Sequence, residues 1–373
     1  MNYYIIAGEA SGDLHASNLI KELKKRDVHA KFRGWGGDLM QQQGTELVKH
    51  YKELAFMGFV EVVLNLKTIL KNLSFCKKDI LENRPDALIL VDYPGFNLKI
   101  AKWAKENQIR VFYYISPQIW AWKQNRVHQI KQNVDKMFVI LPFEKEFYKK
   151  FNVDVDFVGH PLLDAIAHRN PSDLNDFCAK NNLPNKPIIA LLPGSRAQEI
   201  SKMLPIMLSV VNRFPDFQFV VAGAPSQHLS FYKQFLNSQV SLVENQTYSL
   251  LEHSTAALVT SGTATLETAL FGVPQVVCYK GSFVSYHIAK MIIKVGYISL
   301  VNLISDKEIV KELIQNELNT ETLATELTKI ISEKKHNELK IQYQELQSKL
   351  GGHGASSRTA DLICNYLKLK STC

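Results

Sequence analysis

The fold is decided by the stretch ALVTSGTATLETALFGVPQVVCY, residues Ala257–Tyr279. An apolar run ends at Thr260, a Ser-Gly-Thr turn follows, and a helical pattern continues to Gly272. The Gly-Val-Pro sequence that follows is typical of a helix end, and a second apolar run begins after Pro274. A strand, a helix and a strand in this order predict two parallel strands joined by a crossover helix.

The same alternation continues along the whole chain. Strands are predicted for the apolar or β-branched runs YYIIA, ALILVDY, IRVFYYI, MFVIL, VDVDFVG, PIIALLP, FQFVVAG, AALVTS and PQVVCY. Continuous apolar strands separated by helices indicate parallel sheets that are covered on both faces. A polar stretch with three prolines, 167–187, divides the two series. We therefore expect an α/β protein with two doubly wound, Rossmann-like domains that face each other across a cleft.

The expected domains are residues 1–170 and 171–345, followed by a C-terminal helical tail, 346–373, that packs back on the first domain or exchanges with a partner. The chain has 373 residues, of which 44 are basic and 36 acidic, and the resulting charge of +8 favours an anionic ligand or surface. No nucleic-acid-binding motif accompanies this charge, so we expect no nucleic acid. The five cysteines form no C-x-x-C pair, which predicts reduced thiols in the cytoplasm.

Two turns in the second half predict a nucleotide site. In LLPGSRAQEI, Gly194 closes the turn, Ser195 is the expected helix N-cap, and Arg196 can donate two hydrogen bonds to phosphate oxygens. In the SGT turn, Gly262 lets a ligand approach the backbone, and Glu267 can accept hydrogen bonds from a ribose diol. A capped helix with a surface arginine is the alternative for the first turn.

The motifs along the chain resemble one family of glycosyltransferases. SGTATLETALFGVP, together with PGSR, resembles the nucleotide-sugar half of the GT-B glycosyltransferases. The other motifs, in chain order, are AGEASGD, MGFVEVV, VDYPGFN, SPQIWAW, LPFEKEFY, VGHPLLD and VNLI. Their order and their spread over nearly the whole chain resemble the lipid-A-disaccharide synthase family.

This resemblance implies an inverting transfer of 2,3-diacylglucosamine from UDP-2,3-diacylglucosamine to the 6-hydroxyl of 2,3-diacylglucosamine 1-phosphate (lipid X), with release of UDP. A single displacement of this kind needs a base on the acceptor hydroxyl and stabilisation of the leaving UDP. No cofactor and no metal are expected, because the D-x-D at 154–156 alternates with apolar residues as an edge strand does. The implied location is the cytoplasmic face of the inner membrane, with peripheral attachment, and a homodimer is left open.

Asp92 in VDYPGFN is the expected catalytic base, because a carboxylate at the end of a buried strand has little structural reason to be there. Asn97 is expected to orient it. The alternative is an acid that caps a turn. Some relatives carry a second acid where this chain has Gly95, which leaves Asp92 as the base candidate within the motif.

The remaining site predictions are acceptor, donor and membrane contacts. The acceptor or cleft residues are Glu9, Ser11, Gly12, Asp13, Asn97, Ser116, Trp120, Trp122, Arg126 and His160. The UDP-binding residues are Gly194, Ser195, Arg196, Glu199, Ser261, Gly262, Thr263, Glu267 and Asn302. The membrane contacts are Phe59, Val63, Leu66, Lys67, Leu70 and Lys71, which follow one helical stripe.

Several of these residues have a structural alternative. Glu9 and Asp13 can hold neighbouring loops, and Ser11 or Asp13 can cap the helix that follows. The two tryptophans can pack in the core. His160 can serve as a hinge or pack in the core, and the stripe at 59–73 can pack on the sheet. Two other functions also remain open at this point, namely a UDP-sugar epimerase and a nucleotide-sugar-binding module without catalysis.

Overall fold

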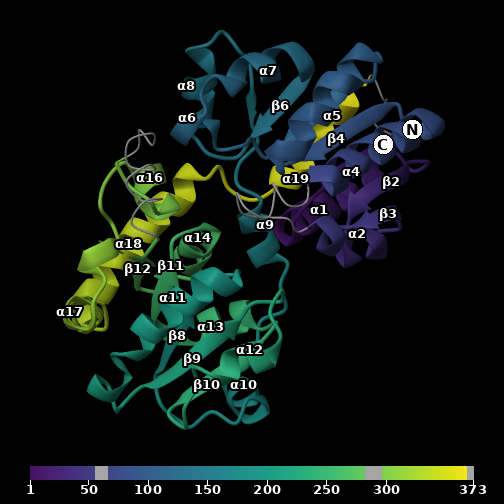
Figure 1. Ribbon diagram of the computed structural model, residues 1–373. Coiled ribbons are helices and arrows are strands. Elements are labelled where there is room, and N and C mark those ends of the chain that lie inside the picture. The colour runs from purple at the N-terminus through teal and green to yellow at the C-terminus, as the bar shows by residue number, and fades with distance from the viewer. Residues whose placement is uncertain (55–65, 282–295, 368–373) are drawn as a thin grey trace. The chain divides into compact units, whose positions relative to one another are not determined.

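The computed structural model describes residues 1–54, 66–281 and 296–367 (Figure 1). The chain forms two compact units. Unit 1 comprises Met1–Ala167 and Leu350–Cys373, and unit 2 comprises His168–Lys349. Unit 1 therefore contains both the beginning and the end of the chain.

Unit 1 is built on a seven-stranded sheet in which every pair of neighbouring strands is parallel. The strand order is β3-β2-β1-β4-β5-β6-β7. The strands are β1 (Asn2–Ala7), β2 (Lys31–Gly36), β3 (Glu46–His50), β4 (Ala87–Val91), β5 (Val111–Tyr114), β6 (Lys136–Val139) and β7 (Asp156–Phe157). The order reverses between β1 and β4, which makes the sheet doubly wound.

Unit 2 is built on a six-stranded parallel sheet of the order β10-β9-β8-β11-β12-β13. Its strands are β8 (Ile188–Leu192), β9 (Gln218–Gly223), β10 (Val240–Glu244), β11 (Ser254–Thr260), β12 (Gln275–Tyr279) and β13 (Lys311–Ile314). The order reverses between β8 and β11. Each unit is thus a Rossmann-like fold with its own reversal point.

Helices connect the strands in both units. In unit 1 they are α1 (Ala10–Arg26), α2 (Asp38–Gln42), α4 (Leu66–Asn83), α5 (Pro94–Glu106), α6 (Ile119–Trp122), α7 (Arg126–Asn133), α8 (Glu144–Lys149), α9 (Leu162–Ala167) and α19 (Ala355–Tyr366), with a 3-10 turn η1 (Tyr51–Leu54). In unit 2 they are α10 (Leu174–Lys180), α11 (Ala197–Leu208), α12 (Leu229–Lys233), α13 (Thr247–Glu252), α14 (Thr263–Leu270), α16 (Leu300–Ser305), α17 (Thr320–Ile330) and α18 (Glu333–Lys349), with η2 (Val211–Arg213) and η3 (Gln315–Glu317).

The central strands carry the core of each unit. All residues of β4 are fully buried, as are Ala256–Val259 of β11, so side chains on both faces of these strands leave water. Burying one Val, Leu or Ile side chain stabilises the fold by ~1.5–3 kcal/mol. This explains why the continuous apolar runs were predicted correctly as strands. The strands β2, β3, β10 and β13 were not predicted, because they contain charged, polar or glycine residues.

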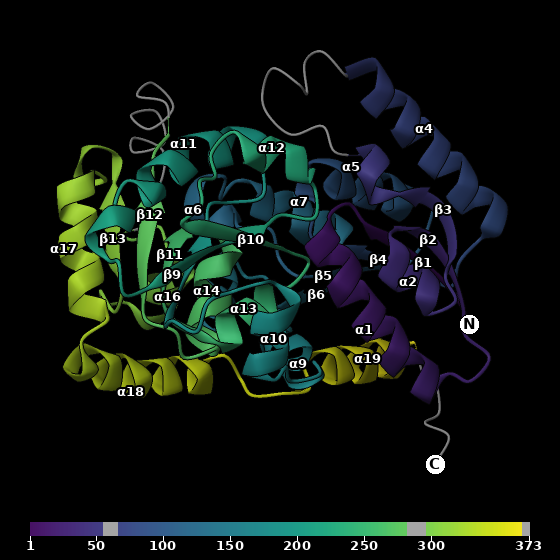
Figure 2. The same cartoon turned by 90° about the horizontal axis from the view of Figure 1, so that it is seen from below.

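The last helix completes unit 1. In Figure 2, α19 (yellow) lies against α1 (purple), and the two helices are in contact. The Arg26 guanidinium of α1 donates two hydrogen bonds to the Asp361 carboxylate, at 2.6 and 3.0 Å. Asp164 of α9 accepts hydrogen bonds from the backbone N–H groups of Gly354 (2.5 Å) and Ser356 (3.1 Å) and so caps the start of α19.

A glycine permits this return of the chain. Gly159 has a φ of +82°, and a Cβ there would lie 2.5 Å from Nη2 of Arg358. The Arg358 guanidinium in turn donates to the carbonyl of Val158, at 2.8 Å. The VGHP turn and the Gly-rich segment before α19 are therefore fitted to each other within unit 1.

Candidate functional site

The predicted motifs lie at the reversal points of the two sheets. In unit 1, GEASGD follows β1 and DYPGFN follows β4, and these two strands pair with Ala7 opposite Val91. In unit 2, PGSR follows β8 and SGT follows β11, and these strands pair with Leu192 opposite Val259. Ligands of doubly wound sheets bind outside the carboxyl ends of the strands at such a point. Each unit therefore has one pair of loops at the position where ligands of this fold bind.

Asp92 occupies a strained turn at the end of β4. Its φ is +44° and that of Tyr93 is +50°, so two consecutive non-glycine residues adopt left-handed backbone. Such residues cost ~1–3 kcal/mol each and persist only where the surroundings enforce them. The carbonyl of Asp92 accepts hydrogen bonds from Asn97 Nδ2 (2.7 Å) and from the Tyr113 hydroxyl (2.6 Å). The turn is thus held by the two side chains that contact it, and Asn97 is completely buried behind it.

The GEASGD loop lies against this turn. A Cβ at Gly8 would lie 2.4 Å from the Tyr93 ring, so the close approach of the two loops requires glycine. Burial, followed by the charge of Glu9, raises the pKa of Asp92 to about 7, against a hydrogen bond from the Tyr93 backbone that lowers it. A carboxylate with a pKa near neutrality is well suited to general base catalysis at physiological pH.

Of the alternatives for Asp13, the structure shows that it holds a neighbouring loop. Helix α1 begins before it, with Glu9 at the N-cap position, so neither Asp13 nor Ser11 caps α1. The buried Asp13 carboxylate instead accepts three hydrogen bonds from the backbone N–H groups of Gly37 (2.7 Å), Leu39 (3.1 Å) and Met40 (3.1 Å). It therefore caps α2 from a distance of more than twenty residues in sequence.

The other two residues of this loop differ from Asp13 and from each other. Ser11 is exposed. Gly12 is buried, and a Cβ there would lie 3.3 Å from the Cβ of Ala7, so it allows close packing of α1 on β1. Of the four residues predicted in this loop, Glu9 is therefore the one that acts electrostatically on Asp92.

The SPQIWAW segment contains one buried and one exposed tryptophan. Trp120 is 7% exposed and packs edge-on against Phe143, with 4.9 Å between ring centroids. Trp122 is 49% exposed, and the Lys123 ammonium lies over its ring at 4.2 Å. Burial and the neighbouring Arg126 guanidinium lower the pKa of Lys123. Two adjacent cations beside an exposed aromatic ring are suited to an anionic group such as a phosphate.

His160 is a buried residue of unit 1. Its Nδ1 accepts a hydrogen bond from the Leu162 backbone (3.2 Å), and its own backbone N–H donates to the Leu350 carbonyl (2.9 Å). Burial, and then the neighbouring His15, lower the pKa of His160 to about 3. The predicted cleft residue is thus a neutral core histidine at the point where the chain returns from unit 2.

In unit 2, the PGSR turn places Arg196, not Ser195, at the N-cap of α11. Gly194 has a φ of +112°, a conformation that favours glycine. The Glu199 carboxylate reaches back and accepts hydrogen bonds from the Ser195 backbone N–H (3.3 Å) and from Arg196 Nη1 (3.2 Å). The N–H group and the guanidinium that were predicted to bind phosphate therefore already donate hydrogen bonds to the Glu199 carboxylate. Both Ser195 and Arg196 lie at the surface.

The SGT turn leaves the N-terminus of α14 open. Gly262 and Thr263 are exposed, and a Cβ at Gly262 would meet no atom within 4 Å. Ser261 Oγ donates to the Ile298 carbonyl at 2.9 Å, which fixes the turn to the segment before α16. Glu267 accepts a hydrogen bond from the Tyr248 hydroxyl (3.2 Å), and burial raises the pKa of Glu267.

Asn302 is completely buried, and its hydrogen-bonding capacity is used within unit 2. Its Nδ2 donates to the Val310 carbonyl and to Glu312, both at 2.9 Å. Its Oδ1 accepts from the backbone N–H groups of Ile309 (2.8 Å) and Val310 (3.0 Å). In this structure Asn302 holds α16 against β13 and presents no group to a nucleotide.

The two acids of the D-x-D sequence lie beside one lysine. Nζ of Lys136 is 3.8 Å from Asp154 and 3.5 Å from Asp156. In the three described ranges, no group of three or more His, Cys, Asp and Glu side chains has the arrangement of a metal site.

The predicted membrane stripe, 59–73, is described only from Leu66 onward. Phe59 and Val63 lie outside the described residues, and α4 begins at Leu66. Lys67, Leu70 and Lys71 are exposed on α4, whereas Leu73, Cys76 and Ile80 of the same helix are buried. Of the described helices, none combines the length and the apolar character that crossing a membrane requires.

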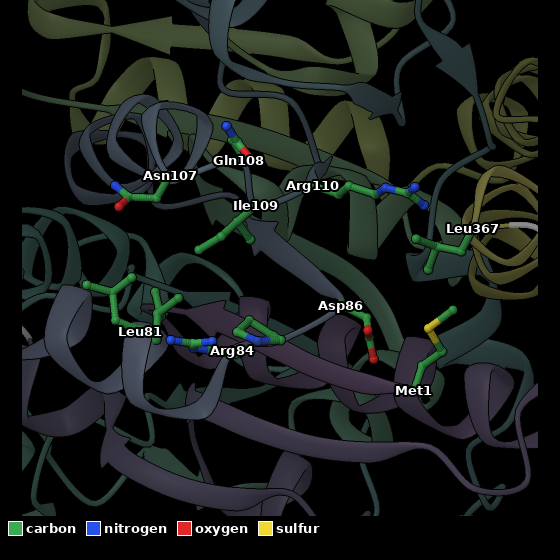
Figure 3. Close-up of a pocket in the computed structure, with 11 residues that line it drawn as sticks. Met1, Leu81, Arg84, Asp86, Asn107, Gln108, Ile109, Arg110 and Leu367 are labelled. Atoms are coloured by element: carbon green, nitrogen blue, oxygen red, sulfur yellow. The ribbon is translucent and has the colours of Figure 1, made fainter.

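A cavity of about 680 Å³ lies at the opposite end of the unit 1 sheet (Figure 3). It is lined by residues at the starts of β1, β4 and β5, among them Asp86 and Arg110, and by Leu81, Arg84 and Leu367. No predicted site residue lines it. Because ligands of such sheets bind at the carboxyl ends of the strands, we do not assign the reaction to this cavity.

The two Rossmann-like units define the class of fold. The chain is similar to the glycotransferase of kitacinnamycin (TM-score 0.66, 16% identity, covering 98% of this chain and 99% of that one). It is also similar to the UDP-GlcNAc 2-epimerase from Neisseria meningitidis bound to UDP-GlcNAc (TM-score 0.64, 16% identity, covering 99% and 100%). The fold is therefore GT-B, which confirms the predicted fold class.

The sequence narrows this class to one family. The family model for lipid-A-disaccharide synthetase matches residues 3–364. The lipid-A-disaccharide synthase of Syntrophus aciditrophicus is 40% identical over 380 residues (99% of this chain, 98% of the relative), and that of Geobacter metallireducens is 38% identical over 374 residues (98% and 97%). The chain belongs to the lipid-A-disaccharide synthase family and is a glycosyltransferase of lipid A synthesis, as its motifs predicted.

Proposed function

We propose that this chain transfers 2,3-diacylglucosamine from UDP to the 6-hydroxyl of lipid X, with Asp92 as the general base. The single observation that carries the assignment of the base is the strained turn at Asp92. Its carboxyl group lies at the reversal point of the unit 1 sheet and has a pKa of about 7. A site that maintains both backbone strain and a perturbed carboxyl group is more readily explained by catalysis than by stability.

In the proposed step, the Asp92 carboxylate accepts the proton of the acceptor hydroxyl. The hydroxyl oxygen forms a bond to the anomeric carbon of the donor sugar, while the bond from that carbon to the UDP oxygen breaks on the opposite face. The bonding electron pair leaves with UDP, so the α-linked donor gives a β-1,6-linked disaccharide 1-phosphate. No covalent enzyme intermediate is needed.

We place the donor on unit 2. The N-termini of α11 and α14 and the guanidinium of Arg196 would stabilise the charge that develops on UDP. For the phosphates to bind, they must replace the Glu199 carboxylate at Ser195 and Arg196 or share these donors with it. Glu267, held by Tyr248, would accept hydrogen bonds from the ribose diol.

We place the acceptor on unit 1, with Trp122, Lys123 and Arg126 near its phosphate. The exposed face of α4, with Leu70 and Phe75 beside Lys67 and Lys71, supports peripheral binding to an anionic membrane. The proposed location is therefore the cytoplasmic face of the inner membrane. A homodimer stays a prediction.

The experiment is to incubate the protein with UDP-2,3-diacylglucosamine and lipid X, without added metal, and to measure disaccharide and UDP. Both products should form, and Asp92→Asn should lower the rate by ~100- to 10,000-fold while UDP affinity stays nearly unchanged. Products that form without the acceptor would favour an epimerase or a hydrolase. If the protein binds UDP but forms no product, it is a nucleotide-sugar-binding module without catalysis. A wild-type rate in Asp92→Asn would show that Asp92 is not the general base.

A further inference from the structure

Glu144 in the LPFEKEFY motif is a buried acid to which the proposed mechanism gives no role. It is the first residue of α8 and is 1% exposed, and no basic side chain pairs with it in the described part of the chain. Its Oε2 accepts hydrogen bonds from the backbone N–H groups of Ile140 (3.1 Å) and Leu141 (2.9 Å), which follow β6. The carboxyl group therefore folds back over the end of the strand and closes the turn between β6 and α8.

The same segment contacts the loop that follows β5. The Ser116 hydroxyl forms a 2.8 Å hydrogen bond with the Tyr148 hydroxyl, and both residues are buried. The Trp120 indole N–H has no hydrogen-bond partner among the described residues. Burial raises the pKa of Glu144 to about 7, against hydrogen bonds from the Leu141 and Ile140 backbones that lower it. Tyr148, by this hydrogen bond, and Phe143, by its ring contact with Trp120, thus connect the segment that Glu144 closes to the loop after β5.

The loop that they contact begins under strain and is linked to the site of Asp92. Ile115, which directly follows β5, has a φ of +67°, and this conformation is unfavourable for a β-branched residue. Its backbone N–H donates to the Phe138 carbonyl of β6, at 3.1 Å. Tyr113, which lies in β5, donates a hydrogen bond to the carbonyl of Asp92. Hydrogen bonds therefore link the Asp92 turn to β5, the end of β5 to β6, and the loop after β5 to Tyr148 of α8.

Closing this turn is the structural role of Glu144, and it requires the removal of a carboxyl group from water, which costs several kcal/mol when the group ionises. Buried acids of this kind concentrate at functional sites. The position of Glu144, at the carboxyl edge of the sheet that carries Asp92, agrees with such a role.

We infer that Glu144 is a positioning residue for the acceptor: it fixes the turn between β6 and α8, and the Phe143 and Tyr148 side chains of that segment contact the loop after β5. Glu144 thereby sets the loop that carries Trp122, Lys123 and Arg126. The inference rests on the proposed function, since it assumes that this loop binds the acceptor. Glu144 does not itself touch the reacting atoms. Its loss should therefore affect acceptor binding and leave the donor site on unit 2 unchanged.

The test compares Glu144→Ala and Glu144→Gln with Glu146→Gln, which changes an exposed acid two residues further along the same helix. In the disaccharide assay, Glu144→Ala should raise the acceptor KM by ~10- to 100-fold, as expected for a misplaced binding loop, with donor KM and UDP affinity nearly unchanged. Glu144→Gln should recover most of this loss, because its amide oxygen can still accept from the Ile140 and Leu141 N–H groups. The control variant should match the wild type.

A wild-type acceptor KM in folded Glu144→Ala would overturn the inference. An equal loss toward donor and acceptor would also overturn it, since that indicates a general effect on folding. If Glu144→Ala does not fold, Tyr148→Phe removes the bond to Ser116 more gently and should show the same selective rise, and an unchanged acceptor KM there would overturn the inference. Failure of the wild type to form disaccharide would instead refute the proposed function, and this inference with it.

Discussion

Replacing Glu9 by glutamine should move the acid limb of the pH–rate profile to lower pH. In the structure, the Glu9 charge is the second cause, after burial, of the raised pKa of Asp92. Glutamine keeps the size of the side chain and removes the charge. The pKa of Asp92 should then fall, but it should stay above its ordinary value because the burial remains.

The magnitude follows from the pKa of Asp92, which rises from 3.8 to about 7. This difference corresponds to ~4 kcal/mol in favour of the protonated carboxyl group, at 1.36 kcal/mol for each pH unit. A general base works only when deprotonated, so kcat/KM of the wild type should fall below about pH 7 by a factor of ~10 for each further pH unit. In Glu9→Gln the same fall should begin at a lower pH.

The assay measures kcat/KM for the acceptor at saturating donor across the neutral range. Glu144→Gln is the control, because Glu144 also has a pKa of about 7, and the acid limb should survive in that variant if it belongs to Asp92. If the acid limb disappears in Glu144→Gln, the titrating group is Glu144 and not Asp92. A limb at the same pH in Glu9→Gln and in the wild type would refute the electrostatic coupling of Glu9 to Asp92.

Four further results are expected. Because the folded pKa of Asp92 lies above the unfolded value, ionisation destabilises the fold as pH rises through about 7, and Asp92→Asn should need more urea to unfold than the wild type at pH 8 but not at pH 4. Arg196→Ala should weaken UDP binding by ~1.5–3 kcal/mol in calorimetry, as expected for hydrogen bonds to a charged group, and an unchanged affinity would relocate the anion site. Asp164→Ala removes the acceptor of two backbone N–H groups at the start of α19 and should lower the free energy of unfolding by ~1–2 kcal/mol; an identical urea midpoint would contradict the role of this cap. Reversing the charges of Lys67 and Lys71 should reduce co-sedimentation with anionic vesicles, since each lysine near such a surface contributes ~1 kcal/mol, and undiminished co-sedimentation would assign the contact to another face.

The sequence was sufficient for the parts of the fold that depend on local patterns. Continuous apolar runs predicted the buried central strands, because a strand covered by helices on both faces must be apolar throughout. Gly-rich turns after these strands predicted where ligands should bind, because the carboxyl ends of parallel strands meet at one edge. The buried acid at Glu144 was quoted within a motif but given no role, although an acid directly after a predicted strand is the same signal that singled out Asp92.

The tertiary structure decided the roles of the polar residues, because a role depends on partners that are distant in sequence. Asp13 caps α2 because β2 brings the backbone of Gly37 to it, and no spacing in the motif indicates this. Asn302 is saturated by Ile309, Val310 and Glu312, because the chain turns back on itself between α16 and β13. His160 is buried because α19 returns to unit 1 over the turn that contains it. Residue type and order therefore determine which strands form and where their loops meet, whereas the partners that folding supplies determine whether a side chain in such a loop serves the ligand or the fold.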